Sequence, residues 1–90
     1  MSELPFTLVI LPEALRYVER LPKQVRGNIR SRLDGLAALP QPQMAKPLKG
    51  MKGTWRLRVG DYRIIYRIDH AQRQVTVIHV GNRKDVYRDL

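Results

Sequence analysis

The arginines of the stretch WRLRVGDYRIIYRID, residues 55–69, are the side chains of this sequence best suited to chemistry. The stretch contains four of them, Arg56, Arg58, Arg63 and Arg67. A guanidinium group binds phosphate oxygens through paired N–H donors, and several such groups can enclose one phosphate. Arginine keeps its proton in proteins, so it stabilises negative charge but does not act as a base. The pattern therefore predicts a phosphate-binding surface.

Further cationic side chains stand on both sides of this stretch in the sequence. Three lysines precede it, and a basic C-terminal segment that contains Tyr87 follows it. Charge for the backbone and a ring for an unstacked base are what single-stranded RNA requires. We therefore expect RNA contacts from Lys46, Lys49, Lys52, Arg67, Lys84 and Arg88.

The composition agrees with a small protein that meets polyanions. The chain has 90 residues and a net charge of +9, and 43% of its residues are apolar, enough for one hydrophobic core. This length predicts a single domain over residues 1–90. Such an excess of positive charge raises the rate of encounter with nucleic acid, anionic membranes or acidic proteins.

Other functional classes are disfavoured by what the sequence lacks. There is no cysteine, which excludes a disulfide framework and a thiolate metal site and suits a reducing cytosol. No cluster of acids or histidines suggests a metal site, and no glycine-rich loop between a strand and a helix suggests a nucleotide cofactor. The N-terminus reads as neither a signal peptide nor a membrane span. We expect a cytoplasmic protein with no metal and no cofactor.

The elements that must position the arginines can be predicted from periodicity. Residues 6–11 form a short apolar run typical of a buried strand. Pro12 begins a helix with one apolar stripe, Pro22 interrupts it, and a second helix follows to about Leu39. Residues 41–54 are predicted as a loop. From Thr54 the period changes to two, which indicates strands.

The two strands around Gly60 and Asp61 are predicted to form a hairpin with a two-residue turn. This register places an apolar and aromatic set on one face, where it must pack on the helices. The opposite face pairs Arg58 with Arg63, Arg56 with Ile65, and Thr54 with Arg67. Like charges placed directly opposite are unfavourable by about 0.2–1 kcal/mol. A bound anion would relieve that repulsion.

A third strand, residues 75–80, is mostly apolar and therefore predicted to be internal. The order β-α-α-β-β-β predicts an α+β fold in which two N-terminal helices pack on a small antiparallel sheet. His79 lies in this strand among apolar neighbours, and we interpret it as structural. His70, Asp61 and Asp69 are interpreted as turn residues.

Two segments, KPLKGMKGTWRLRVGDYRIIYRID and VGNRKDVYR, carry a resemblance to the RelE/ParE superfamily of toxins from toxin–antitoxin pairs. They resemble the family's Trp–Arg–hydrophobic–Arg–x–Gly–Asp–Tyr–Arg core and its Val–Gly–x–Arg–x–x–Val–Tyr ending. The helical half fits in order and length and carries little signature. The resemblance implies a RelE-like fold, similar to microbial ribonucleases, and cleavage of mRNA in the ribosomal A site by attack of the 2′-hydroxyl.

The resemblance also implies a set of catalytic residues at matching positions. These are Arg56, Arg58, Arg63, Arg83 and Tyr87. The first two positions are lysine in the best-known member, and the interval between the last two is shorter here than in that member. By this resemblance, Arg63 would hold the scissile phosphate, Arg83 the leaving or transition-state charge, and Tyr87 would orient the mRNA and assist proton transfer. Because arginine is not a base, no residue is assigned that role.

Two other functions remain open from the sequence. A ParE-like inhibitor of DNA gyrase has the same fold, although that branch generally lacks the clustered arginines and terminal tyrosine. A nucleic-acid-binding module without activity is the other. The expected partners are mRNA, the ribosome and a RelB-like antitoxin that folds on binding. Contact with operator DNA is expected only through that antitoxin, and no contact with membranes is expected.

Overall fold

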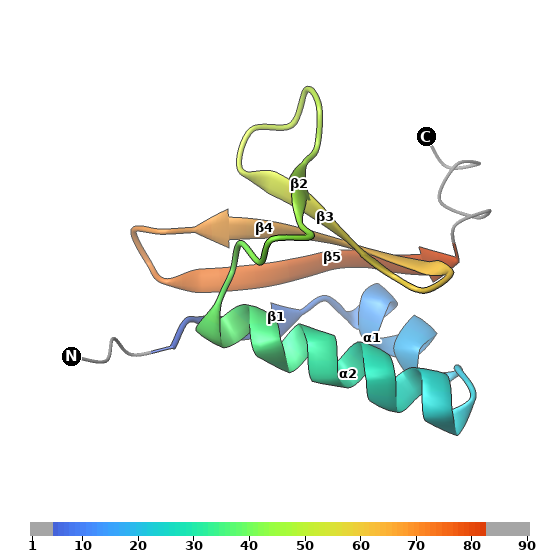
Figure 1. Cartoon of the computed structure of the whole chain (residues 1–90). Coiled ribbons are helices and arrows are strands. Elements are labelled where there is room, and N and C mark those ends of the chain that lie inside the picture. The colour runs from blue at the N-terminus through green and yellow to red at the C-terminus, as the bar shows by residue number, and fades with distance from the viewer. Residues whose placement is uncertain (1–4, 83–90) are drawn as a thin grey trace.

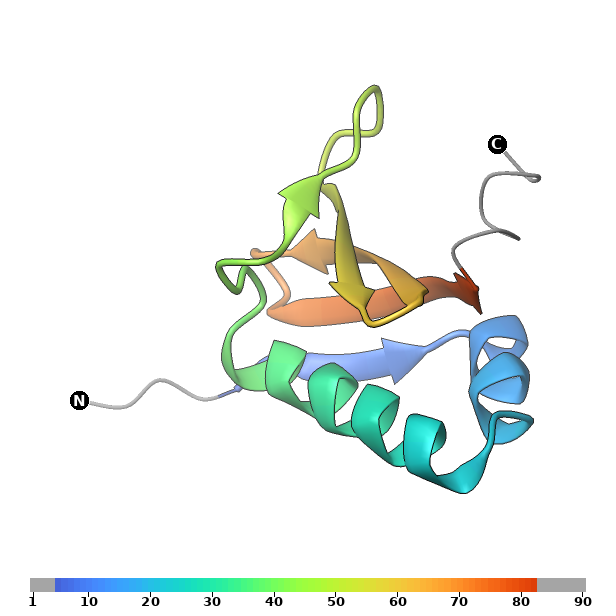
Figure 2. The same cartoon turned by 45° about the vertical axis from the view of Figure 1, so that its right-hand side comes forward.

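The structure, a computed structural model, describes residues 5–82. Its elements are β1 (Thr7–Ile10), α1 (Pro12–Glu19), α2 (Lys23–Ala38), β2 (Lys46–Pro47), β3 (Thr54–Val59), β4 (Tyr62–Asp69) and β5 (Gln74–Asn82). Both helices lie on one side of a twisted sheet, and no described helix covers the other side, which is here called the open face (Figures 1 and 2). The predicted α+β architecture is thereby confirmed.

The strands form one sheet in the order β1-β5-β4-β3-β2. β5 pairs with β4 antiparallel and with β1 parallel, so the sheet is mixed, whereas we expected an antiparallel one. The reason is that the helical pair carries the chain away from β1, and the chain returns through three antiparallel strands whose last one runs beside β1. β5 is internal, as its apolar composition predicted.

The segment predicted as a loop, residues 41–54, contains a two-residue strand. Lys46 and Pro47 of β2 pair antiparallel with Arg56 and Trp55 of β3. Beyond β2 the Leu48 amide donates to the Thr54 carbonyl at 2.8 Å, which continues the pairing. Figure 1 shows that the loop between β2 and β3 projects away from the rest of the sheet.

The helices begin and end near their prolines. Pro12 occupies the first turn of α1 and Glu13 follows it, an arrangement that suits the positive end of the helix dipole. Arg20, Leu21 and Pro22 separate the two helices, and Pro40 follows α2. Leu39, which the periodicity placed on the apolar stripe, is 59% exposed because α2 has already ended.

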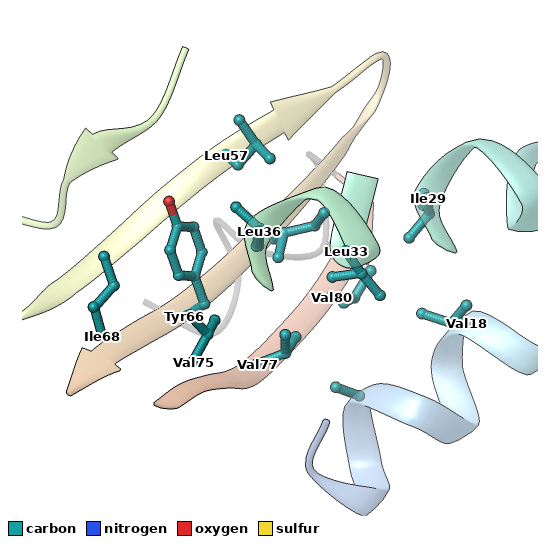
Figure 3. Close-up of a cluster of buried hydrophobic side chains, with 12 residues drawn as sticks. Val18, Ile29, Leu33, Leu36, Leu57, Tyr66, Ile68, Val75, Val77 and Val80 are labelled. Carbon is teal, nitrogen blue, oxygen red and sulfur yellow. The ribbon is translucent and has the colours of Figure 1, made fainter. Parts of the chain in front are cut away.

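One hydrophobic core fills the space between the helices and the sheet. Leu33 and Leu36 of α2 point toward the strands, and Ile29 faces Val18 of α1 (Figure 3). The buried residues of this cluster are Ala14, Val18, Ile29, Leu33, Leu36, Leu57, Ile64, Tyr66, Ile68, Val75, Val77 and Val80.

Tyr66 connects this core to the end of α2. Its side chain is fully buried, and its hydroxyl donates to the Pro40 carbonyl at 2.6 Å. Burial raises the pKa of the Tyr66 phenol from 10.0 to about 12, because the charged phenolate would lose its hydration. The residue therefore stays neutral and holds the start of the 41–54 segment against the sheet.

The predicted register of the β3–β4 hairpin is confirmed at every pair. Val59 faces Tyr62 across the turn, and Arg58 faces Arg63. Gly60 occupies the first turn position with a φ of 58°, a conformation that glycine adopts without the clash that a Cβ would cause. The turn thus fixes which side chains share the open face of the hairpin.

The pairing of β4 with β5 contains an irregularity. Ile65 pairs with His79, yet Tyr66 pairs with Val77, so β5 has one extra residue at this point. Such a bulge changes which side chains face which side of a sheet. It allows Val77 and Val80 both to enter the core, although they are three residues apart.

Candidate phosphate-binding site

The registers of four strands place the basic residues on the open face of the sheet in two rows. In the first row Lys46, Arg56, Ile65 and His79 are successive cross-strand neighbours. In the second row Arg58 pairs with Arg63, and Arg63 pairs with Gly81. These residues alternate with core residues along their strands, so the core that forces Leu57 and Ile64 inward also forces the arginines outward.

A cavity of about 250 Å³ lies among the cationic members of the two rows. It is lined by Met44, Lys46, Arg56, Leu57, Arg58 and Arg63. Four of these side chains are cationic, and none is acidic. Three of the residues predicted to be catalytic thus lie around one cavity, together with one of the lysines predicted to bind RNA.

The arginines differ in how they are held. Arg56 and Arg63 are partly buried, whereas Arg58 is exposed near the turn. The Arg58 Nε donates to the Gly60 carbonyl at 3.4 Å, a long contact that aligns the side chain along its own strand. The partly buried pair lies closer to the surface of the sheet, and the exposed Arg58 has more room to adapt to a ligand.

The remaining predicted RNA-binding residues with described positions lie apart from this cavity. Lys49 and Lys52 are in the projecting loop between β2 and β3, and both are exposed. Arg67 is exposed and has Thr54 and Thr76 as its cross-strand neighbours. The predicted residues Arg83, Lys84, Tyr87 and Arg88 lie outside the described residues.

A larger hollow, about 640 Å³, lies at the other end of β3. It is lined by loop and strand residues that include Met51, Trp55 and Ile68, and its rim has Lys52 and His70 but no arginine. We assign the phosphate chemistry to the smaller cavity, because the clustered guanidinium groups are there.

The two histidines occupy different surroundings. His70 lies in the β4–β5 turn with its ring edge-on to Phe6, at 5.8 Å between ring centroids. This position fits the interpretation of His70 as a turn residue. His79 lies on the open face opposite Ile65, and its buried Nε2 has no hydrogen-bond partner. Strict alternation from Val75 and Val77 would have put His79 in the core; the bulge, which the sequence did not reveal, moves it.

Sequence reasoning missed two features of the cavity. Met44 lines the cavity, although its place in a segment predicted as a loop did not indicate that it would be a site residue. Lys46 lies directly opposite Arg56, which only the pairing of the two-residue strand β2 reveals. Within residues 5–82 no three His, Asp or Glu side chains gather to hold a metal ion, and no helix is long and apolar enough to cross a membrane.

Comparison with known proteins agrees with this architecture. The family model described as the ParE toxin of the type II toxin–antitoxin system parDE matches residues 8–87. Toxin RelE of Mycobacterium tuberculosis is 31% identical over 85 residues, which cover 93% of this chain and 88% of that protein. Toxin RelG of the same organism is 30% identical over 86 residues, covering 94% and 99% respectively.

Solved structures show the same fold. The toxin–antitoxin complex RelBE2 of M. tuberculosis contains a chain with a TM-score of 0.76 and 30% identity, with 88% of this chain and 99% of that chain covered. The archaeal RelE–RelB complex from Pyrococcus horikoshii gives a TM-score of 0.79 at 23% identity, covering 88% and 96%. The chain therefore belongs to the RelE/ParE superfamily of toxins from type II toxin–antitoxin systems.

Proposed function

We propose that this toxin is a ribosome-dependent endoribonuclease that cleaves mRNA in the A site by attack of a 2′-hydroxyl on its own phosphate. The observation that carries the proposal is the cavity on the open face, which gathers Arg56, Arg58 and Arg63 with Lys46 and has no acid among the described residues that line it. Arg58 and Arg63 are cross-strand neighbours of like charge, an arrangement that is unfavourable by itself. A phosphodiester bound between them turns that repulsion into two attractions.

The size of the cavity supports a phosphodiester as the ligand. About 250 Å³ is below the roughly 300–1,000 Å³ that small-molecule sites occupy. A phosphate with part of its sugar fits such a space, and the neighbouring nucleotides would extend along the open sheet. The exposed Arg67, Lys49 and Lys52 would then contact the flanking backbone.

The chemistry follows from the types of side chain. Charge on the non-bridging phosphate oxygens increases as the 2′-oxygen attacks, and preorganised guanidinium groups stabilise it. Arg63 would hold the scissile phosphate, because it is partly buried beside Gly81 in the middle of the second row. By the family resemblance, Arg83 would stabilise the leaving oxygen and Tyr87 would orient the mRNA.

The proposed test is cleavage of a defined mRNA on purified ribosomes, with the products analysed for a 2′,3′-cyclic phosphate and a 5′-hydroxyl. Arg63→Ala, Arg83→Ala and Tyr87→Phe should each slow cleavage, while Arg30→Ala, on the exposed face of α2, should not. A 2′-deoxynucleotide at the scissile position should abolish the reaction. Full activity in all three site variants would refute the site.

A second function is favoured by the family model, whose description names ParE. A ParE-like toxin would inhibit DNA gyrase without cutting RNA. A supercoiling assay with purified gyrase separates the two, since only a ParE-like protein would inhibit it. RNA binding with steep salt dependence, but neither cleavage nor gyrase inhibition, would indicate a simple binding module.

We further propose that a RelB-like antitoxin neutralises this chain in the cytoplasm, where ribosomes are available. RelB appears with RelE in the archaeal complex, and a net charge of +9 favours an acidic segment that folds against the basic face. Co-expression with the product of the adjacent small open reading frame should restore growth. Failure of that product to bind or neutralise the toxin would count against this partner.

A further inference from the structure

The cavity has cations to hold a phosphate, but none of its arginines can take a proton. Attack by a 2′-hydroxyl requires that its proton be removed. Arg56, Arg58 and Arg63 cannot remove it, because a guanidinium group is protonated at any pH at which the protein works. Of the described side chains that line the cavity, Lys46 is the one whose chemistry includes a neutral form with a lone pair that can accept a proton.

The position of Lys46 suits that role. It pairs directly with Arg56 across β2 and β3, and it lines the same cavity as Arg58 and Arg63. Its side chain is exposed on a strand at the edge of the sheet. The four-carbon stem of lysine can therefore swing its amine over the cavity without disturbing the core.

We infer that Lys46 is the general base of the proposed cleavage, acting from the strand opposite Arg56. The inference rests on the proposed nuclease function. It assigns the proton acceptor to a residue of β2, outside the set of catalytic positions that the family resemblance implies. In this arrangement the base comes from β2 and the phosphate-binding arginines come from β3 and β4. The ribose 2′-hydroxyl and the scissile phosphate would both bind in the cavity between them.

The neutral amine of Lys46 accepts the 2′-hydroxyl proton while the 2′-oxygen forms its bond to phosphorus. The bond from phosphorus to the 5′-oxygen of the next nucleotide breaks, and its electron pair leaves with that oxygen, which takes a proton from water. The hydroxide so formed removes the proton from Lys46. The products are a 2′,3′-cyclic phosphate and a 5′-hydroxyl.

His79 is the competing candidate, because its Nε2 is buried without a partner on the same face. Two observations favour Lys46. His79 does not line the cavity, and Ile65, itself nearly buried, stands between Arg56 and His79 in the row. A proton acceptor must come within about 2.6–3.2 Å of the hydroxyl. Lys46 is the direct neighbour of Arg56 in the row, so its amine can reach a hydroxyl in the cavity more easily than the His79 ring can.

Because the sequence contains no cysteine, a single cysteine introduced at position 46 can be modified selectively, so that only the end group of this side chain changes. Lys46→Cys can be alkylated with 2-bromoethylamine, which rebuilds an amine at the length of lysine. Alkylation with (2-bromoethyl)trimethylammonium places the same positive charge at the same length but offers no nitrogen lone pair. Single-turnover cleavage of ribosome-bound mRNA is then measured for both proteins.

We expect Lys46→Cys and Lys46→Arg to lose about 10²- to 10⁴-fold in rate, the usual contribution of a general base. The rebuilt amine should recover most of that loss, and the trimethylammonium protein should not. Lys23→Arg, an exposed lysine at the start of α2, is the matched control and should cleave at the wild-type rate. Thermal melting checks that each protein is folded.

A second substrate distinguishes whether Lys46 acts as a general base or as a general acid. Replacing the 5′-bridging oxygen by sulfur gives a leaving group that needs no proton, so it would rescue a variant that lacks an acid. The defect of Lys46→Arg should persist with this substrate if Lys46 is the base. Rescue by the sulfur substrate would overturn the assignment, as would recovery with the trimethylammonium group.

Failure of the inference can be told from failure of the proposed function. If the wild-type protein does not cleave mRNA on ribosomes, the proposed function is wrong. If the wild type cleaves and Lys46→Arg cleaves equally fast, only the role of Lys46 is wrong. A large loss in His79→Asn with none in Lys46→Arg would give the proton acceptor to the histidine and overturn the inference.

Discussion

The facing pair Arg58 and Arg63 leads to a prediction in which stability and activity change in opposite directions. The two residues are cross-strand partners on the open face, and none of the described residues that line the cavity beside them is acidic. Replacing Arg58 by Gln removes one charge and keeps a polar side chain of similar reach. We expect the variant to be more stable than the wild type and less active.

The magnitude follows from Coulomb's law in water, with about 7 Å taken as the separation of the two guanidinium groups. Because Arg58 is exposed, water governs the interaction, and two unit charges about 7 Å apart repel by about 0.6 kcal/mol. The screening length is about 10 Å at 0.1 M salt, so roughly half of that repulsion remains there, and at 1 M almost none does. In a domain of this size 0.6 kcal/mol corresponds to about 2–5 °C in melting temperature.

The assay is thermal unfolding at low, intermediate and high salt, followed by circular dichroism. Arg67→Gln is the matched control, since Arg67 is an exposed arginine on β4 whose cross-strand neighbours are Thr54 and Thr76. Arg58→Gln should melt higher than Arg67→Gln at low salt, and the difference should vanish at 1 M. Inorganic phosphate should raise the wild-type melting temperature more than that of Arg58→Gln.

Two results would refute this reasoning. If Arg58→Gln is no more stable than Arg67→Gln at low salt, the facing arginines do not repel appreciably. If the stability difference survives 1 M salt, its origin is packing or strand propensity and not charge. Either result would remove the physical argument that a bound anion relieves strain in the hairpin.

Three further substitutions test the fold that positions the site. Tyr66→Phe should lower the free energy of unfolding by about 1 kcal/mol, because it removes the hydrogen bond to the Pro40 carbonyl. Since the folded-state pKa of Tyr66 is raised to about 12, wild-type stability should also fall between about pH 10 and pH 12. Urea denaturation at several pH values should show a smaller fall in the variant. Gly60→Ala should cost about 1–2 kcal/mol in urea unfolding, since the φ of 58° penalises a Cβ, while Gly60→Asn should cost less. Leu33→Ala should cost about 2–5 kcal/mol by leaving a cavity under α2, whereas the exposed Leu39→Ala should change stability by less than about 0.5 kcal/mol in the same urea assay.

The hairpin was predictable because its information is local. A glycine in a two-residue turn, with alternating apolar and polar residues on both sides, leaves one register that buries one face. The helices were predictable for the same reason, from the spacing of Ile29 and Leu33 and from the bounding prolines. The parallel pairing of β1 with β5 was not, because nothing local specifies which strand lies beside another.

The sequence by itself determined that four arginines project from one face of a hairpin whose other face is core. It could not determine which other residues share that face. Whether Lys46 meets Arg56 depends on the pairing of a strand only two residues long. Whether His79 faces the arginines or the core depends on one extra residue in β5. Both are settled by packing of the whole sheet against the helices, because the local pattern of these segments is too weak to determine a short pairing or the position of a bulge.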